Sequence, residues 1–490
     1  MRIAVIGAGP AGLTAALQLS RSGASVDVYE ASSQVGGLAR SIDLWGQRVD
    51  LGPHRFFSTD ARVNRFWIDI VGSDYTMVER LTRIYYQGKL FHYPLKPLDV
   101  FAKLGIVETA RSILSYANQG LHRPSKMSET PSFETWVVSR FGRRLYETFF
   151  RTYSEKLWGI PCTELSEDFA AQRIRKLTLS DAIQNALFRR NQTKHRTLAD
   201  CFAYPLRGTG EVYERIARQI VATGGRILLN HPVSQVVIDG QRVTGLRSVN
   251  GLEVPYDHVI STMPITLLIN GINGVPKPVS DAASKLTFRN TVLVYLEVED
   301  PSLFDDQWLY VHDSKVQIGR VTNFRNWGTP ISSHNTTSIL CCELWCNHAD
   351  ATWNANDPDL VKQVSTELQQ IGLLNGQRIC NSHVVRIPRC YPVYRIGYRN
   401  HVDTISEFLQ SIGGLSVIGR YGAFKYNNQD HSILMGLLAA ENVMHSNSHN
   451  LWNLNSDFDS YQEQAFITRS GLVPTPIAER QMEACQYGVG

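Results

Sequence analysis

The 490-residue sequence predicts an α/β protein with a discontinuous Rossmann-type domain, a helical insertion and an antiparallel β-sheet domain. Three observations predict this class. An apolar strand pattern at residues 2–6 runs into a glycine turn and an apolar helix, apolar residues recur at helical spacing between about 96 and 203, and residues 291–347 read as several strands. With 43% hydrophobic and 19% charged residues, the composition excludes a disordered or fibrous chain.

The charge balance excludes a nucleic-acid-binding surface, because 49 Lys and Arg against 45 Asp and Glu give +4 without a basic run. The longest apolar stretch, 259–275, is interrupted by Pro264, Asn270 and Gly271, so we expect no membrane span. The N-terminal strand leaves no room for a signal peptide, which predicts a cytoplasmic protein. Oligomer formation stays open.

The eight cysteines are scattered, as is typical of reduced thiols. Cys341, Cys342 and Cys346 lie near His348, but adjacent residues of a strand point to opposite faces and no second cysteine pair completes four ligands. We therefore expect no metal site.

The first unit of the chain carries a dinucleotide-binding pattern. Gly7, Gly9 and Gly12 separate the strand at 2–6 from an apolar helix. A second strand, 26–30, ends in Glu30, which follows Gly12 by 18 residues. Gly7 permits the turn, Gly9 allows close backbone approach to a pyrophosphate, and Gly12 allows the helix to pack on the strand. The helix N-terminus attracts phosphate, and Glu30 can accept ribose hydroxyls.

The segment after Glu30 decides which dinucleotide is expected. A second glycine pair, Gly36 and Gly37, is followed by Arg40, a pattern typical of FAD proteins of the glutathione-reductase and amine-oxidase type. FAD is therefore the expected cofactor, and a nicotinamide coenzyme would be a second ligand.

The remaining predicted helices and strands divide the chain into domains. Helices are expected at 99–119, 132–150, 168–189, 212–222 and 431–445, and strands at 226–229, 233–238, 241–263 as a pair, 292–298, 308–312, 316–321, 338–346 and 415–418. The predicted FAD domain comprises 1–95, 204–265 and 405–446, the helical domain 96–203, the β-sheet domain 266–404, and the tail 447–490.

Three segments indicate chemistry. Between 142 and 159, aromatic rings on adjacent helical turns offer a stacking surface for a planar base, although such a stripe also packs a core. A Gly52-Pro53-His54 loop can reach the flavin ring. Asp430 is placed to cap the last helix, whose N–H groups could face the flavin.

Together these segments resemble the UDP-galactopyranose mutase family. Family members carry a GPH loop, the helix FF-x-x-Y-T-x-K-Q-W, the segment T-R-I-T-E, a Y-P-V or Y-P-I step and the segment G-R-x-x-x-Y-x-Y-x-x-M-D. The matching segments here start at Gly52, Phe149, Gly319, Tyr391 and Gly419.

The resemblance implies roles for individual residues. The base and its surroundings would lie against Phe149, Phe150, Tyr153 and Trp158. Arg320 would bind the diphosphate, Tyr391 and Tyr426 would line the phosphates and sugar, His54 would lie beside the flavin, and Arg420, with Gly419, and Asp430 would contact FAD.

Several positions depart from the family. Phe57 replaces a second loop histidine, Lys96 replaces an Asn, and Trp345 replaces a substrate-lining Tyr. Arg173 or Arg175 lies near the place of a second diphosphate arginine, with altered spacing.

The resemblance implies a flavin-dependent isomerase that interconverts pyranose and furanose forms of a nucleotide sugar. Reduced FAD would attack the anomeric carbon through N5, form a flavin–sugar adduct and expel the nucleoside diphosphate, with no net redox change. His54, Arg320 and Tyr391 would be the catalytic set, and NAD(P)H or another reductant would activate the flavin.

Two alternatives stay open. An oxidoreductase of the amine-oxidase or protoporphyrinogen-oxidase type would use the same FAD domain, including the turn at 261–264. A non-catalytic escort of prenylated GTPases shares this fold, but the intact glycine turn and Glu30 favour a bound flavin.

Overall fold

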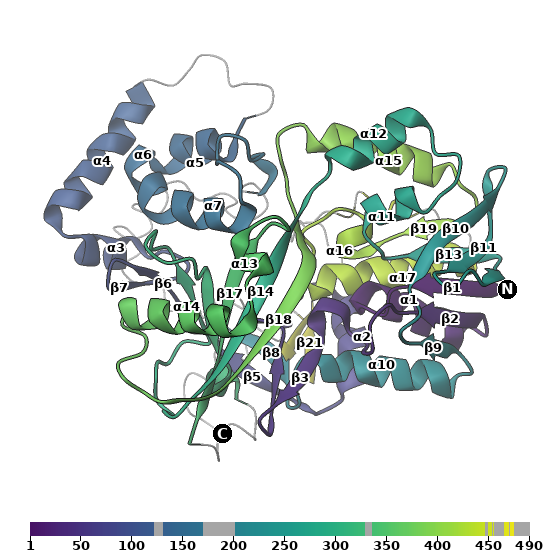
Figure 1. The fold of residues 1–490 in the computed structure, drawn as a ribbon, viewed down its shortest axis with the longest axis horizontal. Helices are drawn as coiled ribbons and strands as arrows, with labels where there is room; N and C mark the ends of the chain where they lie inside the picture. The colour runs from purple at the N-terminus through teal and green to yellow at the C-terminus, as the bar shows by residue number, and fades with distance from the viewer. Residues whose placement is uncertain are drawn as a thin grey trace. The chain divides into compact units, whose positions relative to one another are not determined.

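The computed structural model describes residues 1–121, 131–169, 201–328, 336–445, 449–452, 454, 465–469 and 471–474. The chain forms two compact units (Figure 1). Unit 1 comprises Met1–Val78, Cys201–Thr287 and Tyr398–Gly490, and unit 2 comprises Glu79–Asp200 and Phe288–Gly397.

Unit 1 is built on a five-stranded parallel sheet with the order β19-β13-β1-β2-β9. The strands are β1 (Arg2–Ile6), β2 (Ser25–Tyr29), β9 (Arg226–Leu228), β13 (His258–Ser261) and β19 (Leu415–Val417). Three segments far apart in the sequence therefore share one sheet, as the discontinuous Rossmann-type prediction requires. The helix α1 (Pro10–Arg21) contacts both α10 (Gly210–Ala222) and α17 (Gln429–His445). Their apolar side chains form one buried core.

The remaining described elements of unit 1 are smaller. They are η1 (Gly37–Ala39), β3 (Ser41–Leu44), β4 (Gln47–Asp50), α2 (Ala61–Val71), β5 (Tyr75–Glu79), β8 (Cys201–Pro205), β10 (Val233–Asp239), β11 (Arg242–Ser248), β12 (Glu253–Pro255), α11 (Ile265–Asn270), α12 (Lys277–Lys285), α15 (Tyr398–Gln410), α16 (Gly419–Gly422), β20 (Ala465–Thr468) and β21 (Gly471–Pro474).

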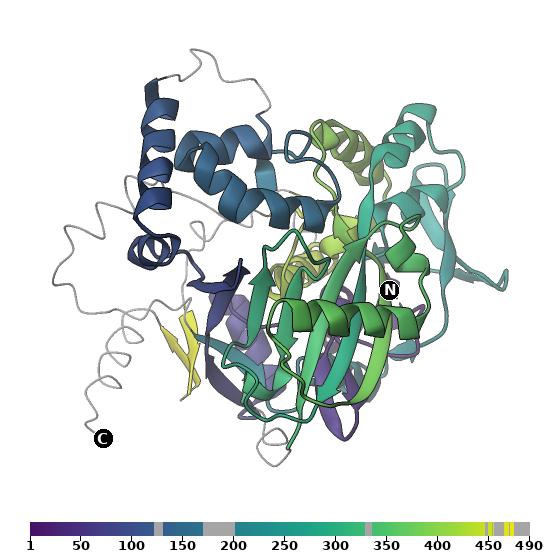
Figure 2. The same cartoon turned by 60° about the vertical axis from the view of Figure 1, so that its left-hand side comes forward.

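Unit 2 is built on a seven-stranded sheet with the order β18-β14-β17-β16-β15-β6-β7, in which only the β15–β6 pair is parallel. The strands are β6 (Thr82–Tyr86), β7 (Lys89–His92), β14 (Phe288–Val298), β15 (Trp308–Val311), β16 (Arg320–Asn323), β17 (Ser338–Cys346) and β18 (Ile379–Pro392). The helix α14 (Asp357–Gln370) lies across one face of the sheet (Figure 2), where Leu360, Val364 and Leu368 complete an apolar core.

The helical part of unit 2 contains several short elements. They are α3 (Pro97–Leu104), α4 (Ile106–Leu121), α5 (Phe133–Phe141), α6 (Arg143–Tyr146), the π-helical turn η2 (Glu147–Arg151), α7 (Thr152–Trp158), η4 (Phe324–Trp327) and α13 (Ala351–Asn354). Among the described helices of the chain, none is long and apolar enough to cross a membrane.

The structure differs from several expected boundaries. The helices expected at 99–119 and 132–150 are each divided at a glycine with positive φ, Gly105 and Gly142, with φ angles of 87° and 82°. The strand expected at 316–321 begins only at Arg320, because the residues before it form a loop, and β18 was not expected. The helix expected at 168–189 lies outside the described residues from 170 onward.

The expected domain division also differs from the two units. β6 and β7, expected in the FAD domain, pair with β15 and extend the sheet of unit 2. The helical and β-sheet insertions form one unit, because α6, η2 and α7 pack with that sheet, whereas α11 and α12 belong to unit 1.

Candidate functional site

The glycine turn of unit 1 is packed so tightly that side chains are excluded. Gly7 has a φ of 100°, and a Cβ there would lie 2.1 Å from the Thr262 hydroxyl oxygen. A Cβ at Gly12 would lie 2.0 Å from the Gly7 carbonyl oxygen. Gly37 approaches Gly9 so closely that its Cβ would be 3.1 Å from the Gly9 Cα. Two glycine segments therefore meet backbone to backbone beside the start of α1.

The N-terminus of α1 is open to an anion. Gly9 is the N-cap residue and has no side chain that could cap the helix, and Pro10 follows it. The Leu13 N–H donates to the Gly9 carbonyl at 3.0 Å. The N–H groups before Leu13 at this helix end, together with the helix dipole, suit a pyrophosphate.

Glu30 lies at the end of β2, next to this turn. Its Oε2 accepts a hydrogen bond from the Ala8 N–H at 2.8 Å, and its Oε1 accepts from the Ser32 N–H and hydroxyl at 2.9 and 2.8 Å. These bonds fix the carboxylate, whose remaining lone pairs can accept ribose hydroxyls. Arg40 donates to the Gly37 carbonyl at 3.2 Å and so closes the second glycine turn.

The C-terminal segment returns to the same place. Gly419 has a φ of 83°, and a Cβ there would lie 3.2 Å from the Ala11 Cβ. Arg420 donates to the Asn427 carbonyl at 3.0 Å, and its guanidinium lies 4.3 Å from the centre of the Tyr426 ring. Asp430 is buried in the first turn of α17, with its Oδ1 3.1 Å from Nδ1 of His431. The glycine cradle, the open α1 N-terminus and Glu30 together fit FAD.

The loop that contains His54 is held through its backbone. The Thr209 hydroxyl donates to the His54 carbonyl at 2.8 Å. Thr209 also donates its N–H to Asp50, a fully buried carboxylate that accepts further bonds from Ser41 and Tyr204. Burial outweighs these donors and raises the pKa of Asp50 to about 6.

In unit 2, Arg320 is bound to a carboxylate. Its Nε and Nη2 donate to the two oxygens of Glu343 on the neighbouring strand at 2.5 and 2.7 Å, and Nη2 also lies 3.4 Å from the Tyr391 hydroxyl. Burial opposes the charge, but Glu343 holds the pKa of Arg320 above its ordinary value. The fork geometry leaves the Nη1 edge for another acceptor.

Aromatic rings surround this pair. The Trp345 indole lies over Gly319, where a Cβ would be 2.0 Å from the ring. Tyr153 meets Trp345 edge to face at 5.3 Å, and Tyr391 meets Trp158 at 6.3 Å. The structure thus brings together Arg320, Tyr391, Trp345, Tyr153 and Trp158.

Two other predicted aromatic residues pack mainly with their neighbours. Phe149 is 2% exposed and contacts Phe91 edge to face, and Phe150 stacks on Phe141 at 5.4 Å. Phe149 is therefore part of the core behind the site. Arg173 and Arg175 lie outside the described residues.

The sequence predictions missed three polar residues, the buried Glu343 and Asp50 and the half-buried Lys156. Glu343 is the one charged residue of the apolar strand β17, which was an available signal. Lys156 donates to the carbonyls of Val311, Asp313 and Ile318, and burial lowers its pKa to about 8. Lys156 thus ties α7 to the loop before Arg320.

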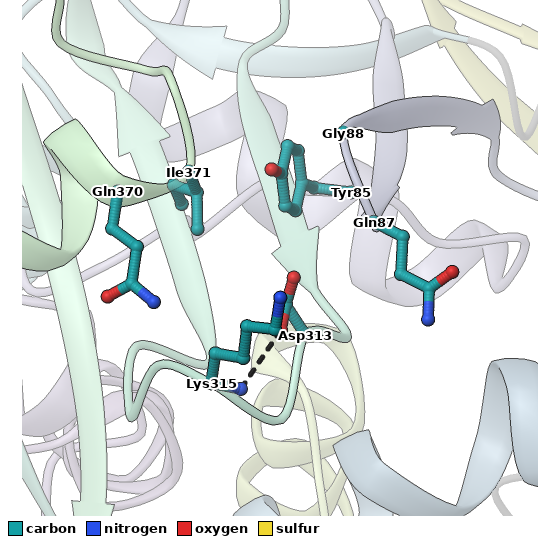
Figure 3. A pocket seen from close by; sticks show the side chains of 7 residues that line it. All are labelled: Tyr85, Gln87, Gly88, Asp313, Lys315, Gln370 and Ile371. Atoms are coloured by element: carbon teal, nitrogen blue, oxygen red, sulfur yellow. Dashed lines mark hydrogen bonds between the residues drawn. The ribbon is translucent and has the colours of Figure 1, made fainter.

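Unit 2 also contains a hollow that lies apart from the predicted site residues. A hollow of about 390 Å³ is lined by Tyr85, Gln87, Gly88, Asp313, Lys315, Gln370 and Ile371 (Figure 3) and contains no predicted site residue. Within the described ranges, no group of three His, Cys, Asp or Glu side chains is arranged to hold a metal ion.

The chain is similar to several known proteins. It is 28% identical over 171 residues to a probable UDP-galactopyranose mutase of Klebsiella pneumoniae, a match that covers 33% of this chain and 42% of that protein. It is 24% identical over 294 residues to a neurosporene-forming phytoene desaturase of Rhodobacter capsulatus, covering 53% and 52%. The matches span about half or less of these relatives' length.

Solved structures show the fold. A crystal structure of reduced UDP-galactopyranose mutase has a TM-score of 0.80 at 23% identity and covers 93% of this chain and 96% of its own. A putative protoporphyrinogen oxidase from Exiguobacterium has a TM-score of 0.71 at 17% identity, covering 91% and 99%. The sequence profile of the family described as flavin containing amine oxidoreductase matches residues 10–444. Since this match covers most of the chain, the protein belongs to the flavin-containing amine oxidoreductases.

Proposed function

We propose that the protein is an FAD-dependent nucleotide-sugar mutase that interconverts pyranose and furanose forms without net redox change. The observation that carries the proposal is the Arg320 site, in which a guanidinium held by Glu343 lies beside the Tyr391 hydroxyl and the Trp345 indole. A fixed guanidinium with a remaining donor edge suits a diphosphate, and the neighbouring rings suit a base and a sugar. The fold likeness to reduced UDP-galactopyranose mutase supports the same reaction.

Unit 1 would hold the cofactor. Gly7, Gly9 and Gly12 would admit the pyrophosphate to α1, Glu30 would accept the ribose hydroxyls, and Gly37 and Arg40 would shape the second turn. Gly419, Arg420 and Asp430 would contact FAD from the C-terminal segment. Reduced FAD supplies the nucleophile for the anomeric carbon when it is bound.

The protein's own part is to bind the leaving diphosphate and to position the sugar. Arg320 would neutralise the charge that develops on the diphosphate, with Tyr391 and Tyr426 at the phosphates and sugar. Tyr153, Phe150 and Trp345 would line the base and sugar, backed by the buried Phe149 and Trp158. His54 would lie beside the flavin, and Arg173 or Arg175 would supply a second cation. NAD(P)H or another reductant would activate the flavin.

Trapping tests this proposal. Dithionite-reduced protein, incubated with a UDP, GDP or dTDP sugar and then treated with cyanoborohydride, should yield a flavin–sugar product, whereas oxidised protein should not. Arg320→Ala should abolish turnover while FAD stays bound. Absence of a trapped product with every nucleotide sugar would exclude the mutase.

A second candidate is an FAD oxidoreductase, because desaturases are among the similar proteins. A polyene substrate in the place of the proposed nucleotide sugar would lie against the Arg320–Glu343 ion pair, and removing charge from water against an apolar ligand is unfavourable. The ion pair therefore favours the mutase. Oxygen consumption or acceptor reduction with a non-nucleotide substrate would favour the oxidoreductase.

A further inference from the structure

Gln429, the first residue of α17, is a polar side chain in the interior of unit 1, with 7% of its surface exposed. Its Oε1 accepts a hydrogen bond from the Tyr213 hydroxyl on α10 at 2.7 Å. Its Nε2 lies 3.4 Å from the His54 carbonyl oxygen and 3.3 Å from the Arg55 carbonyl oxygen. One amide group therefore connects α10, α17 and the loop that contains His54.

The same loop is held from two other elements. The Thr209 hydroxyl, just before α10, donates to the His54 carbonyl at 2.8 Å. Phe56 forms a two-way backbone bridge with Ala203 of β8, with N–O distances of 3.3 and 3.2 Å, and its ring stacks on Trp67 at 4.5 Å. Gln429 is the contact of this loop with the N-terminus of α17, directly before Asp430.

We propose that Gln429 is a positioning residue that sets the His54 loop against the first turn of α17. A carbonyl oxygen held in place fixes the plane of its peptide group. Gln429 engages two consecutive carbonyls, so it fixes the peptide groups on both sides of Arg55 and restricts the backbone that carries His54. This inference rests on the proposed flavin site, where His54 and Asp430 are both expected beside the cofactor.

Gln429→Met isolates the amide group. Methionine has nearly the same length and volume but neither donates to carbonyls nor accepts well from a buried hydroxyl. Tyr213→Phe removes only the bond to Oε1 and leaves both contacts with the loop. Gln410→Met, at an exposed position at the end of α15, is the matched control.

Hydrogen exchange of the full-length holoprotein, read by mass spectrometry, tests the role. In Gln429→Met, peptides covering residues 52–57 should exchange about tenfold faster or more, while peptides from the middle of α17 keep their protection. The flavin absorption band and midpoint potential should shift in the same variant. Tyr213→Phe should change loop exchange less than Gln429→Met, and Gln410→Met should match the parent protein.

Unchanged exchange at 52–57 in Gln429→Met, or an equal change in Gln410→Met, would overturn the role. A changed loop with an unchanged flavin band and potential would also overturn it, because Gln429 would then be only structural. If the parent protein binds no flavin, the proposed function fails by itself. Loop exchange in the flavin-free protein then still decides whether Gln429 holds the loop.

Discussion

At the scale of single residues, the charge at the proposed diphosphate site is smaller than the sequence suggests. Arg320 was expected to bind the diphosphate, but Glu343 is paired with it directly across β16 and β17. The two charges largely cancel at long range, so Arg320 would recognise a diphosphate chiefly through short hydrogen bonds from the Nη1 edge. Glu343 keeps the guanidinium ordered at the cost of attraction for the anion.

Replacing Glu343 should therefore change nucleotide binding in a defined direction. Glu343→Gln keeps an acceptor beside Arg320 but removes the negative charge, so the Kd for UDP should fall about tenfold, roughly 1.4 kcal/mol. The effect should shrink as salt is added. Isothermal titration at two ionic strengths measures both. Glu297→Gln, on β14 and bonded to Thr337 and Asn381, is the control. Weaker UDP binding in Glu343→Gln would contradict this account.

Asp50 should give the protein a pH-dependent stability. Its pKa is about 6 in the folded state, above the ordinary 3.8, so its contribution to stability is fully present below about pH 4 and is lost as the pH rises through 6. The expected loss is of the order of 3 kcal/mol. Asp50→Asn should flatten the difference in unfolding free energy between pH 4 and 7, measured by urea titration. The exposed Asp43→Asn should not. A parallel pH profile in Asp50→Asn would refute the assignment.

At the scale of elements, local patterns predicted the glycine turn, the strands of the parallel sheet of unit 1 and the discontinuity of the domain that contains it. The strand at 2–6, the helix after Gly12 and the strand ending at Glu30 each have a local signal. β18 was missed because its residues before Ile387 are exposed or only half-buried and carry no apolar alternation. The break at Gly142 was missed because the apolar spacing continues across it.

Long-range pairing explains the rest. No local signal shows that β6 pairs with β15, more than 200 residues away, or that Glu343 faces Arg320. The role of Gln429 depends on contacts with His54 and Tyr213, which lie on separate segments. Sequence patterns predicted the residues that would contact the ligands, whereas only the fold shows the buried residues that hold them in place.

The packing of α1 gives a prediction for this element. A Cβ at Gly12 would lie 2.0 Å from the Gly7 carbonyl oxygen and 3.2 Å from a Val5 methyl, both on rigid segments. Gly12→Ala should therefore destabilise the protein by more than about 2 kcal/mol and reduce FAD content, measured by thermal unfolding and flavin absorbance. Gly413→Ala, with its nearest atom 3.4 Å away, should be nearly neutral. An FAD-replete, fully stable Gly12→Ala protein would show that α1 can shift away from β1.

At the scale of the whole molecule, the residues proposed for the cofactor all lie in unit 1, and those proposed for the substrate lie in unit 2 except Tyr426, which belongs to unit 1. The glycine cradle, Glu30 and the start of α17 all belong to unit 1, whereas Arg320, Tyr391, Trp345 and Tyr153 all belong to unit 2. Each unit has its own apolar core. A ligand that binds only the folded form of one unit should stabilise that unit first.

Hydrogen exchange in the presence of FAD alone or UDP alone measures which unit each ligand stabilises. FAD should slow exchange in peptides from β1, α1 and the first turn of α17, and UDP should slow exchange in peptides from α7, β16 and the end of β18. In Arg320→Ala, the protection by UDP should disappear while the protection by FAD stays, because the guanidinium lies outside the cofactor unit. Loss of FAD protection in Arg320→Ala would show that the two recognition sites are not independent. Protection of β1 and α1 peptides by UDP alone, with none in α7 or β16, would place the nucleotide at the glycine cradle and remove the basis for assigning Arg320 to the diphosphate.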